Sequence, residues 1–253
     1  MEKHLIRIPK MALDKSQVLV LVPAFNEVGS IARTIQELVK LELDVLVIDD
    51  GSTDDSAQVA RSAGALVLQL PFNLGVGGAL RAGFQHASWH GYKAVIQVDA
   101  DGQHPADQIV DLISEANSSD CHMVVGSRFL SASTTMRVGR IRRIPMRLLA
   151  SSASRATGVS ITDATSGFRL IQQPLLGEFA QSFPAYYLGD TYEALISAGK
   201  AGYIIREIPA ALHAREVGES SASAPQAIKF IAKCLLVAAL RIHFSIKPFS
   251  VVK

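Results

Sequence analysis

Short apolar runs alternate with amphipathic segments through the first half of the chain. Between the runs, apolar residues recur at helical spacing, as at Ile31, Ile35 and Leu38. The runs are rich in Val, Ile and Leu, as strands buried on both faces of a sheet are. They predict five strands, at 18–25, 44–50, 64–70, 92–98 and 121–128. Strands that alternate with helices in this way predict an α/β fold, with a doubly wound, mostly parallel sheet and helices on both faces.

The alternation stops after Arg128. Farther on, residues 186–210 predict a helix that leads into a last strand, and 224–249 predict an amphipathic helix with basic residues between apolar runs. The chain is therefore expected to have an N-terminal extension, one main domain and a C-terminal segment. The expected bounds of these parts are 1–16, 17–215 and 216–253.

Composition limits the function classes. The chain has 253 residues, 49% of them hydrophobic and only 6% aromatic, which suits one large α/β domain. The net charge of +2 gives no electrostatic reason to expect a nucleic-acid partner. The two cysteines lack metal-binding spacing, the N-terminus lacks the apolar stretch of a signal peptide, and no run of about 18 apolar residues occurs. These features predict a cytoplasmic protein without a membrane-spanning helix.

Polar residues gather where the predicted strands end. Carboxylates follow three strands, and Arg128 follows another. The carboxylates are those of Glu27, Asp49, Asp50, Asp99 and Asp101. One acid at a strand end is often only the cap of the next helix, but ligands of open α/β sheets bind beyond the carboxyl ends of the strands. Recurrence at three strand ends therefore favours a binding site over separate caps.

The segment "QVDADGQHP" (97–105) holds the most informative pair of acids. Asp99 and Asp101 alternate, so an extended backbone turns both carboxylates to one side. Two close carboxylates repel each other unless a cation neutralises them, and Mg²⁺ or Mn²⁺ binds such oxygens together with substrate phosphates. A D-x-D by itself also occurs in turns. His104, before Pro105, is equally consistent with the N-terminal residue of a helix.

The glycine-rich segment 75–83, "GVGGALRAG", raises the alternative of a dinucleotide site. It follows the third predicted strand rather than the first, and its spacing is not G-x-G-x-x-G, which disfavours hydride transfer. A P-loop motif is absent from the sequence. Glycines at the start of a helix can still let a phosphate or sugar approach closely, or can only let the helix pack near the sheet.

Six motifs in this order, over about 18–221, resemble glycosyltransferase family 2, within it the branch of dolichyl- and polyprenyl-phosphate hexose synthases. The motifs are "VPAFNE", "VIDDGSTDDS", "NLGVGGALRAGF", "QVDADGQHP", "VGSRF" and "DATSGFRL". The resemblance implies a GT-A fold and an inverting transfer from a nucleotide-activated sugar. One departure is Val76, which stands where the family commonly has lysine.

The resemblance also implies roles for individual residues. The nucleotide-sugar pocket would comprise Pro23, Ala24, Glu27, Asp49, Asp50, Asp99 and Ala100. A divalent cation, Mg²⁺ or Mn²⁺, would be held with the donor's diphosphate by Asp99, Asp101 and Gln103. Acceptor or donor phosphates would be contacted by Arg128, Arg169, His213 and Arg215, the last two in a basic loop that closes over the site.

The transfer reaction places different demands on the site for a phosphate acceptor and for an alcohol acceptor. Breaking the bond from the sugar to the diphosphate leaves negative charge, which a metal ion and arginines stabilise. A phosphate acceptor is already ionised, whereas an alcohol acceptor needs a general base, for which Asp190 and Glu193 are available. These two acids also suit the start of a helix. The resemblance favours an acid facing the acceptor, so the expected catalytic residues are Asp101, Asp190 and Arg128.

A basic segment raises the question of a membrane. Residues 121–162 contain seven arginines and no acid, which fits either a solvated face or a surface for anionic lipid. The helix at 224–249 fits either a membrane interface or packing on the domain or a partner. We expect a protein attached to the inner face of the cell membrane, with polyprenyl phosphate as acceptor and a small membrane protein as a candidate partner. Two alternatives stay open: transfer to a saccharide hydroxyl, and a non-catalytic subunit that binds a nucleotide-sugar.

Overall fold

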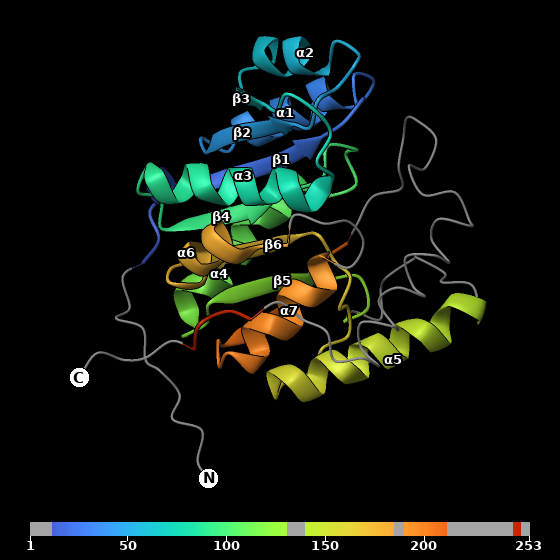
Figure 1. Cartoon of the computed structure of the whole chain (residues 1–253). Helices are drawn as coiled ribbons and strands as arrows, with labels where there is room; N and C mark the ends of the chain where they lie inside the picture. Colours follow the sequence, from blue (N-terminus) through green and yellow to red (C-terminus); the bar gives the residue numbers. More distant parts are fainter. Residues whose placement is uncertain (1–11, 131–139, 185–189, 212–244, 249–253) are drawn as a thin grey trace.

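The computed structural model describes residues 12–130, 140–184, 190–211 and 245–248. These residues form one sheet of seven strands in the order β3-β2-β1-β4-β6-β5-β7 (Figure 1). The strands are β1 (Val18–Ala24), β2 (Asp44–Asp49), β3 (Leu66–Gln69), β4 (Ala94–Gln97), β5 (Met123–Ser127), β6 (Arg169–Gln172) and β7 (Ile205–Pro209). All neighbouring pairs are parallel except those of β6, which runs antiparallel to β4 and β5. The predicted mostly parallel sheet is confirmed.

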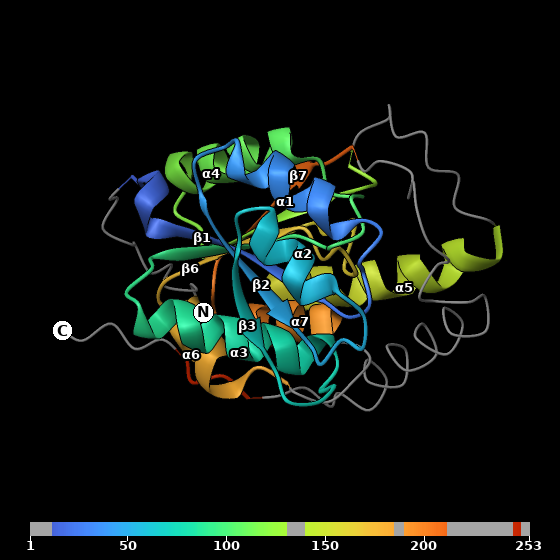
Figure 2. The same cartoon turned by 90° about the horizontal axis from the view of Figure 1, so that it is seen from above.

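Helices cover both faces of this sheet, with α1 and α4 on one side and α3 and α6 on the other (Figure 2). Alternate residues of β1 explain both layers: Leu19 and Leu21 face one core, while Val18, Val20 and Val22 face the other. The helices are α1 (Ile31–Val39), α2 (Ser56–Ser62), α3 (Val76–Trp89), α4 (Ile109–Ser118), α5 (Arg140–Thr157), α6 (Leu175–Ser182) and α7 (Asp190–Lys200). Two short 3-10 turns are η1 (Lys15–Gln17) and η2 (Ala106–Gln108).

The second half of the domain holds the elements that the sequence pattern missed. Strand β6, which the sequence pattern did not predict, is only four residues long and inserts between β4 and β5. Because β6 is antiparallel, its first residue lies at the carboxyl ends of its neighbours: Arg169 pairs with Gln97 of β4 and with Val125 of β5. The loop before β6 is thereby brought to the same edge as the predicted site.

Several sequence predictions fall outside the described residues. Residues 1–11 and 212–244 are not described, so the expected bounds of the main domain and the helix at 224–249 stay predictions. In the described parts of the chain, no helix is both long enough and apolar enough to cross a membrane.

The buried His122, next to β5, gives the fold a testable pH dependence. Its Nδ1 accepts the backbone N–H of Ile204 at 2.9 Å, and its Nε2 is buried without a hydrogen-bond partner among the described residues. Burial lowers the pKa of His122 from 6.5 to about 4. The unfolded chain therefore binds a proton between pH 6.5 and pH 4 that the folded chain does not, and stability is lost as the pH falls through this window.

Between pH 7 and pH 5 we expect His122 to contribute about 2 kcal/mol to this pH dependence. Urea unfolding at pH 7 and pH 5 measures it, with His122→Asn as the variant, because an amide oxygen can replace Nδ1 as acceptor. The variant should lose less stability between the two pH values than the unaltered protein. The exposed His90→Asn is the control. An equal loss in the unaltered protein and His122→Asn would contradict this assignment.

Candidate active site

A cleft of about 550 Å³ opens at the carboxyl edge of the sheet. Its lining includes most of the predicted donor-site residues: Pro23, Ala24, Glu27, Asp50, Asp99, Ala100 and Asp101. It also includes residues to which the sequence assigned no role, namely Phe25, Asn73, Gly75, Val76 and Ala79. The last four come from the start of α3 and the turn before it, so the glycine-rich segment does border the cleft. The ends of three strands and one helix meet here because β1, β2 and β4 are parallel neighbours.

Asp99 and Asp101 both line this cleft, but residues 100 and 101 form a turn after β4 and not the extended backbone on which the prediction rested. The side chain of Asp99 is 42% exposed, whereas that of the adjacent His104 is 4% exposed. The backbone N–H of Asp99 donates to Nδ1 of His104 at 2.9 Å, so the ring proton resides on Nε2, which lies 3.6 Å from Oδ2 of Asp99. The His104 ring packs on Phe168, with ring centroids 5.1 Å apart. His104 therefore orients Asp99 and is not a helix residue.

The two carboxylates fit a divalent cation shared with a substrate. Among the described residues, no group of three His, Cys, Asp or Glu side chains is placed to hold a metal ion. Mg²⁺ commonly binds through one or two carboxylates and completes its shell with water and substrate phosphates, which is the donor set that Asp99 and Asp101 offer. Gln103 does not line the cleft; its backbone N–H donates to Oδ1 of Asp101 at 3.0 Å.

Gly167, in the loop before β6, leaves room for the Asp99 carboxylate. A Cβ atom at this position would lie 3.3 Å and 3.4 Å from its two oxygens and 3.2 Å from Nε2 of Gln97. We expect Gly167→Ala to displace the carboxylate and weaken Mn²⁺ binding about 10-fold, as changes next to a metal ligand do. Calorimetric titration with Mn²⁺ and a nucleoside diphosphate measures this effect. Gly177→Ala, in α6, is the matched control, and equal Mn²⁺ affinity in both variants would contradict the prediction.

Asp49 and Asp50 separate in the structure. Asp50 lines the cleft and accepts the backbone N–H of Leu74 at 2.7 Å. Burial raises the pKa of Asp50, against the hydrogen bonds from Leu74 and Gly75, which lower it. Asp49 does not line the cleft; it accepts from the backbone of Ser52 and from the Gln69 side chain, at 3.2 Å and 3.3 Å. The donor-binding role predicted for the pair therefore fits Asp50 better.

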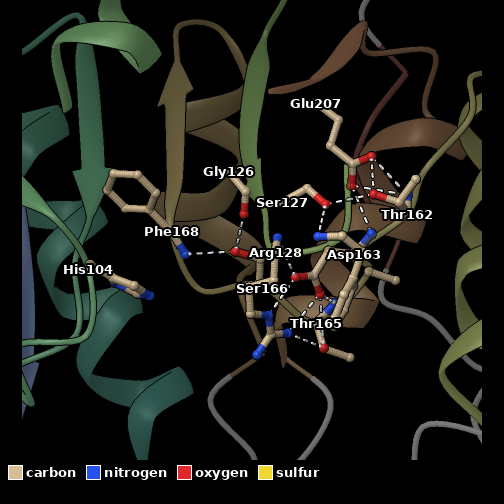
Figure 3. A network of polar contacts seen from close by, with 12 residues as sticks. His104, Gly126, Ser127, Arg128, Thr162, Asp163, Thr165, Ser166, Phe168 and Glu207 are labelled. Atoms are coloured by element: carbon tan, nitrogen blue, oxygen red, sulfur yellow. Dashed lines mark hydrogen bonds and ion pairs between the residues drawn. The ribbon is translucent and has the colours of Figure 1, made fainter. Parts of the chain in front are cut away.

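Arg128 follows β5 and forms a two-pronged ion pair with Asp163 (Figure 3). Its Nε and Nη2 donate to Asp163 at 2.6 Å and 2.7 Å, and Nη2 also donates to Thr165 at 2.9 Å. Burial alone would raise the pKa of Asp163, but the hydrogen bonds and charge of Arg128 outweigh it and lower that pKa. Burial alone would lower the pKa of Arg128, but the hydrogen bonds and charge of Asp163 raise it, and the charge of Asp99 adds to this effect.

The remaining predicted phosphate contacts are placed differently or not described. Arg169 is 2% exposed, and its guanidinium donates to the backbone carbonyls of Ala164, Ser166 and Thr191. These contacts assign Arg169 to holding the loop before β6 rather than to an open phosphate site. Asp190 is the first residue of α7, and its side chain is not described. His213 and Arg215 lie outside the described residues.

Known proteins that resemble this chain include sugar transferases. The chain is 30% identical over 202 residues to an uncharacterised protein of Methanocaldococcus jannaschii, with 78% of this chain and 82% of that protein covered. It is 28% identical to an undecaprenyl-phosphate mannosyltransferase of Micrococcus luteus (82% and 88% covered). It is 26% identical to a polyprenol monophosphomannose synthase of Mycolicibacterium smegmatis (85% and 84% covered).

A solved structure and a family model complete the comparison. Glucosyl-3-phosphoglycerate synthase from Mycobacterium tuberculosis shares the fold, with a TM-score of 0.69 at 21% identity over 88% of this chain and 78% of that one. The predicted GT-A type of α/β fold is thereby confirmed. The model named "Glycosyl transferase family 2" matches residues 19–179, which carry the cleft, the D-x-D segment and the Arg128–Asp163 pair. The chain belongs to glycosyl transferase family 2, and it is a glycosyltransferase.

Proposed function

We propose that this protein transfers a hexose from a nucleotide-sugar to a polyprenyl phosphate, with inversion at the sugar carbon and with a divalent cation. The observation that carries the proposal is that Asp99 and Asp101 both line a cleft large enough for a nucleotide-sugar. The relatives named for undecaprenyl-phosphate and polyprenol mannosyl transfer support the lipid phosphate as acceptor. Structural neighbours crystallised with Mn²⁺ and UDP support the cation.

The reaction is a single displacement. An acceptor phosphate oxygen attacks C1 of the sugar from the face opposite the diphosphate; the bond from C1 to the diphosphate oxygen breaks, and the nucleoside diphosphate leaves with the electron pair. Glu27 and Asp50 would bind the nucleotide, and Asp99 and Asp101 would hold Mg²⁺ or Mn²⁺. A cation held there would supply positive charge to the departing diphosphate. Arg128 would stabilise phosphate charge from a fixed position.

The type of acceptor determines whether the site needs a general base. Its oxygen is ionised at neutral pH, so no side chain has to remove a proton during attack. Asp190 begins α7 and would act as a general base only for an alcohol acceptor. Its role in facing the acceptor stays a prediction.

Attachment to a membrane is supported by α5, which extends away from the sheet in both views (Figures 1 and 2). Among its described side chains, Arg147, Leu148 and Arg155 are exposed, with Leu148 at 56%. An apolar residue between exposed arginines suits an anionic lipid surface. Attachment at the cytoplasmic face and a small membrane protein as partner stay predictions.

A donor-by-acceptor assay tests the proposal. UDP-, GDP- and dTDP-sugars are each incubated with polyprenyl phosphate in detergent, with Mg²⁺ or Mn²⁺, and lipid-linked sugar is measured. We expect product from one donor class. A donor that transfers its sugar only to a saccharide would support the polysaccharide alternative, and binding of a donor without transfer to either acceptor would support the non-catalytic one.

A further inference from the structure

Glu207, in β7, receives hydrogen bonds from two consecutive residues of the loop that carries Asp163 (Figure 3). The Thr162 backbone N–H donates to both carboxylate oxygens, at 2.8 Å and 3.0 Å, and the Thr162 hydroxyl donates at 2.8 Å. The backbone N–H of Asp163 donates at 2.8 Å. Glu207 pairs in register with Val125 of β5, three residues before Arg128. One carboxylate thus holds the backbone that presents the ion-pair partner of Arg128.

The same carboxylate sets the direction of a chain of hydrogen bonds that ends beside Arg128. Because the Thr162 hydroxyl gives its proton to Glu207, its oxygen accepts from the hydroxyl of Ser127, 2.6 Å away. The Ser127 oxygen in turn accepts the backbone N–H of Phe129 at 3.1 Å. Ser127 and Phe129 are the two chain neighbours of Arg128, so Glu207 constrains Arg128 from its own backbone as well as from Asp163.

These contacts leave one edge of the Arg128 guanidinium for an anion. Its described hydrogen bonds use Nε and Nη2, and among the described residues Nη1 has none. The side chain is 21% exposed, while that of Asp163 is fully buried. The Arg128 guanidinium is held rigidly on one side and is open on the other. It therefore needs little reorganisation when negative charge develops at its open edge.

We infer that Glu207 is a positioning residue, which fixes the orientation of Arg128 toward the phosphate groups of the reaction through Thr162, Asp163 and Ser127. The role of Arg128 in the reaction rests on the proposed function. The coupling between Glu207 and Arg128 rests on the structure alone. Glutamine in place of Glu207 would turn an NH₂ group toward backbone N–H donors, and at least one donor would lose its acceptor. A displacement of the guanidinium by about 1 Å can reduce turnover about 100-fold.

The kinetic test is a double-mutant cycle with Glu207→Gln and Arg128→Gln. We expect Glu207→Gln to reduce kcat by about 10- to 100-fold. The affinity for the nucleoside diphosphate with Mn²⁺ should change less than about 3-fold, because neither Glu207 nor Arg128 lines the donor cleft. In the Arg128→Gln background the same substitution should have no further effect. The exposed Arg206→Gln, the preceding residue on β7, is the matched control. Equal losses in both backgrounds, or no loss, would overturn the inference.

A spectroscopic test is independent of turnover. In the ¹⁵N–¹H spectrum, the Arg128 Nε–H signal is assigned by its absence from Arg128→Gln. We expect it to be protected from solvent exchange in the unaltered protein and to lose this protection in Glu207→Gln but not in Arg206→Gln. Ser127→Ala is a smaller change in the same chain of hydrogen bonds and serves as the test variant if Glu207→Gln does not fold. We expect it to lower the protection partly. Protection unchanged in the Glu207 or Ser127 variant would refute the coupling, whereas absence of transfer by the unaltered protein would refute the proposed function.

Discussion

Replacement of Asp101 by asparagine is expected to reduce sugar transfer at least about 1,000-fold and to leave the fold intact. Asp101 lines the cleft together with Asp99, and the proposed function assigns these two carboxylates to the cation. An amide carries no charge, so it would hold neither the cation nor, through it, the donor's diphosphate. The hydrogen bond that Asp101 accepts from the Gln103 backbone can still be accepted by an amide oxygen, which preserves the local turn.

Transfer rate, Mn²⁺ affinity and thermal unfolding of Asp101→Asn measure this prediction together. The matched control is Asp111→Asn, an exposed acid on α4. The control should retain full transfer, and both variants should unfold within a few degrees of the unaltered protein. An Asp101→Asn variant that transfers sugar at a near-normal rate would contradict the role of Asp101 in holding the cation.

Replacement of Asp163 by asparagine should have the largest effect on stability, on the order of 3 kcal/mol. The substitution leaves the Arg128 guanidinium, mostly buried, without its counter-charge, and uncompensated buried charges cost about 3–5 kcal/mol. The pH dependence has a definite sign. Because the pKa of Asp163 is lowered below 3.8 in the folded state, its contribution is present above pH 3.8 and is lost as the pH falls below that value.

Urea unfolding at pH 7 and pH 3 measures the effect of Asp163. A double variant, Arg128→Met with Asp163→Leu, separates stability from catalysis, because a buried ion pair replaced by apolar residues is often close to neutral in stability. We expect the double variant to regain much of the lost stability and none of the lost transfer. Recovery of transfer in the double variant would show that the ion pair only supports the fold.

The sequence predicted the parts of the site that depend on local order. The apolar runs predicted β1, β2 and β4, and polar residues at their carboxyl ends lie in the cleft because parallel neighbours end at one edge. Asp99 and Asp101 follow from the same rule, whereas the expected extended backbone is replaced by a turn at residues 100 and 101.

The remaining parts depend on contacts between distant segments. Glu207 lies 44 residues from Asp163, and nothing in the local sequence around either residue indicates the contact. Arg169 was expected at a phosphate, but the antiparallel register of β6 buries its side chain and turns it to backbone carbonyls. The arginine residue itself predicted a positive side chain at this edge of the sheet. The direction of that side chain depends on strand β6, which is too short for the sequence pattern to predict.

The most direct test of the central claim is the transfer of labelled sugar from the identified donor to polyprenyl phosphate, compared with the polyprenol of the same length. The cleft supplies carboxylates for a cation, and the reaction proposed for it needs an acceptor that is already ionised. The account predicts metal-dependent labelling of polyprenyl phosphate, lost on addition of EDTA, and no labelling of the polyprenol. Equal labelling of the polyprenol, or labelling of a saccharide hydroxyl in preference to the lipid phosphate, would contradict it.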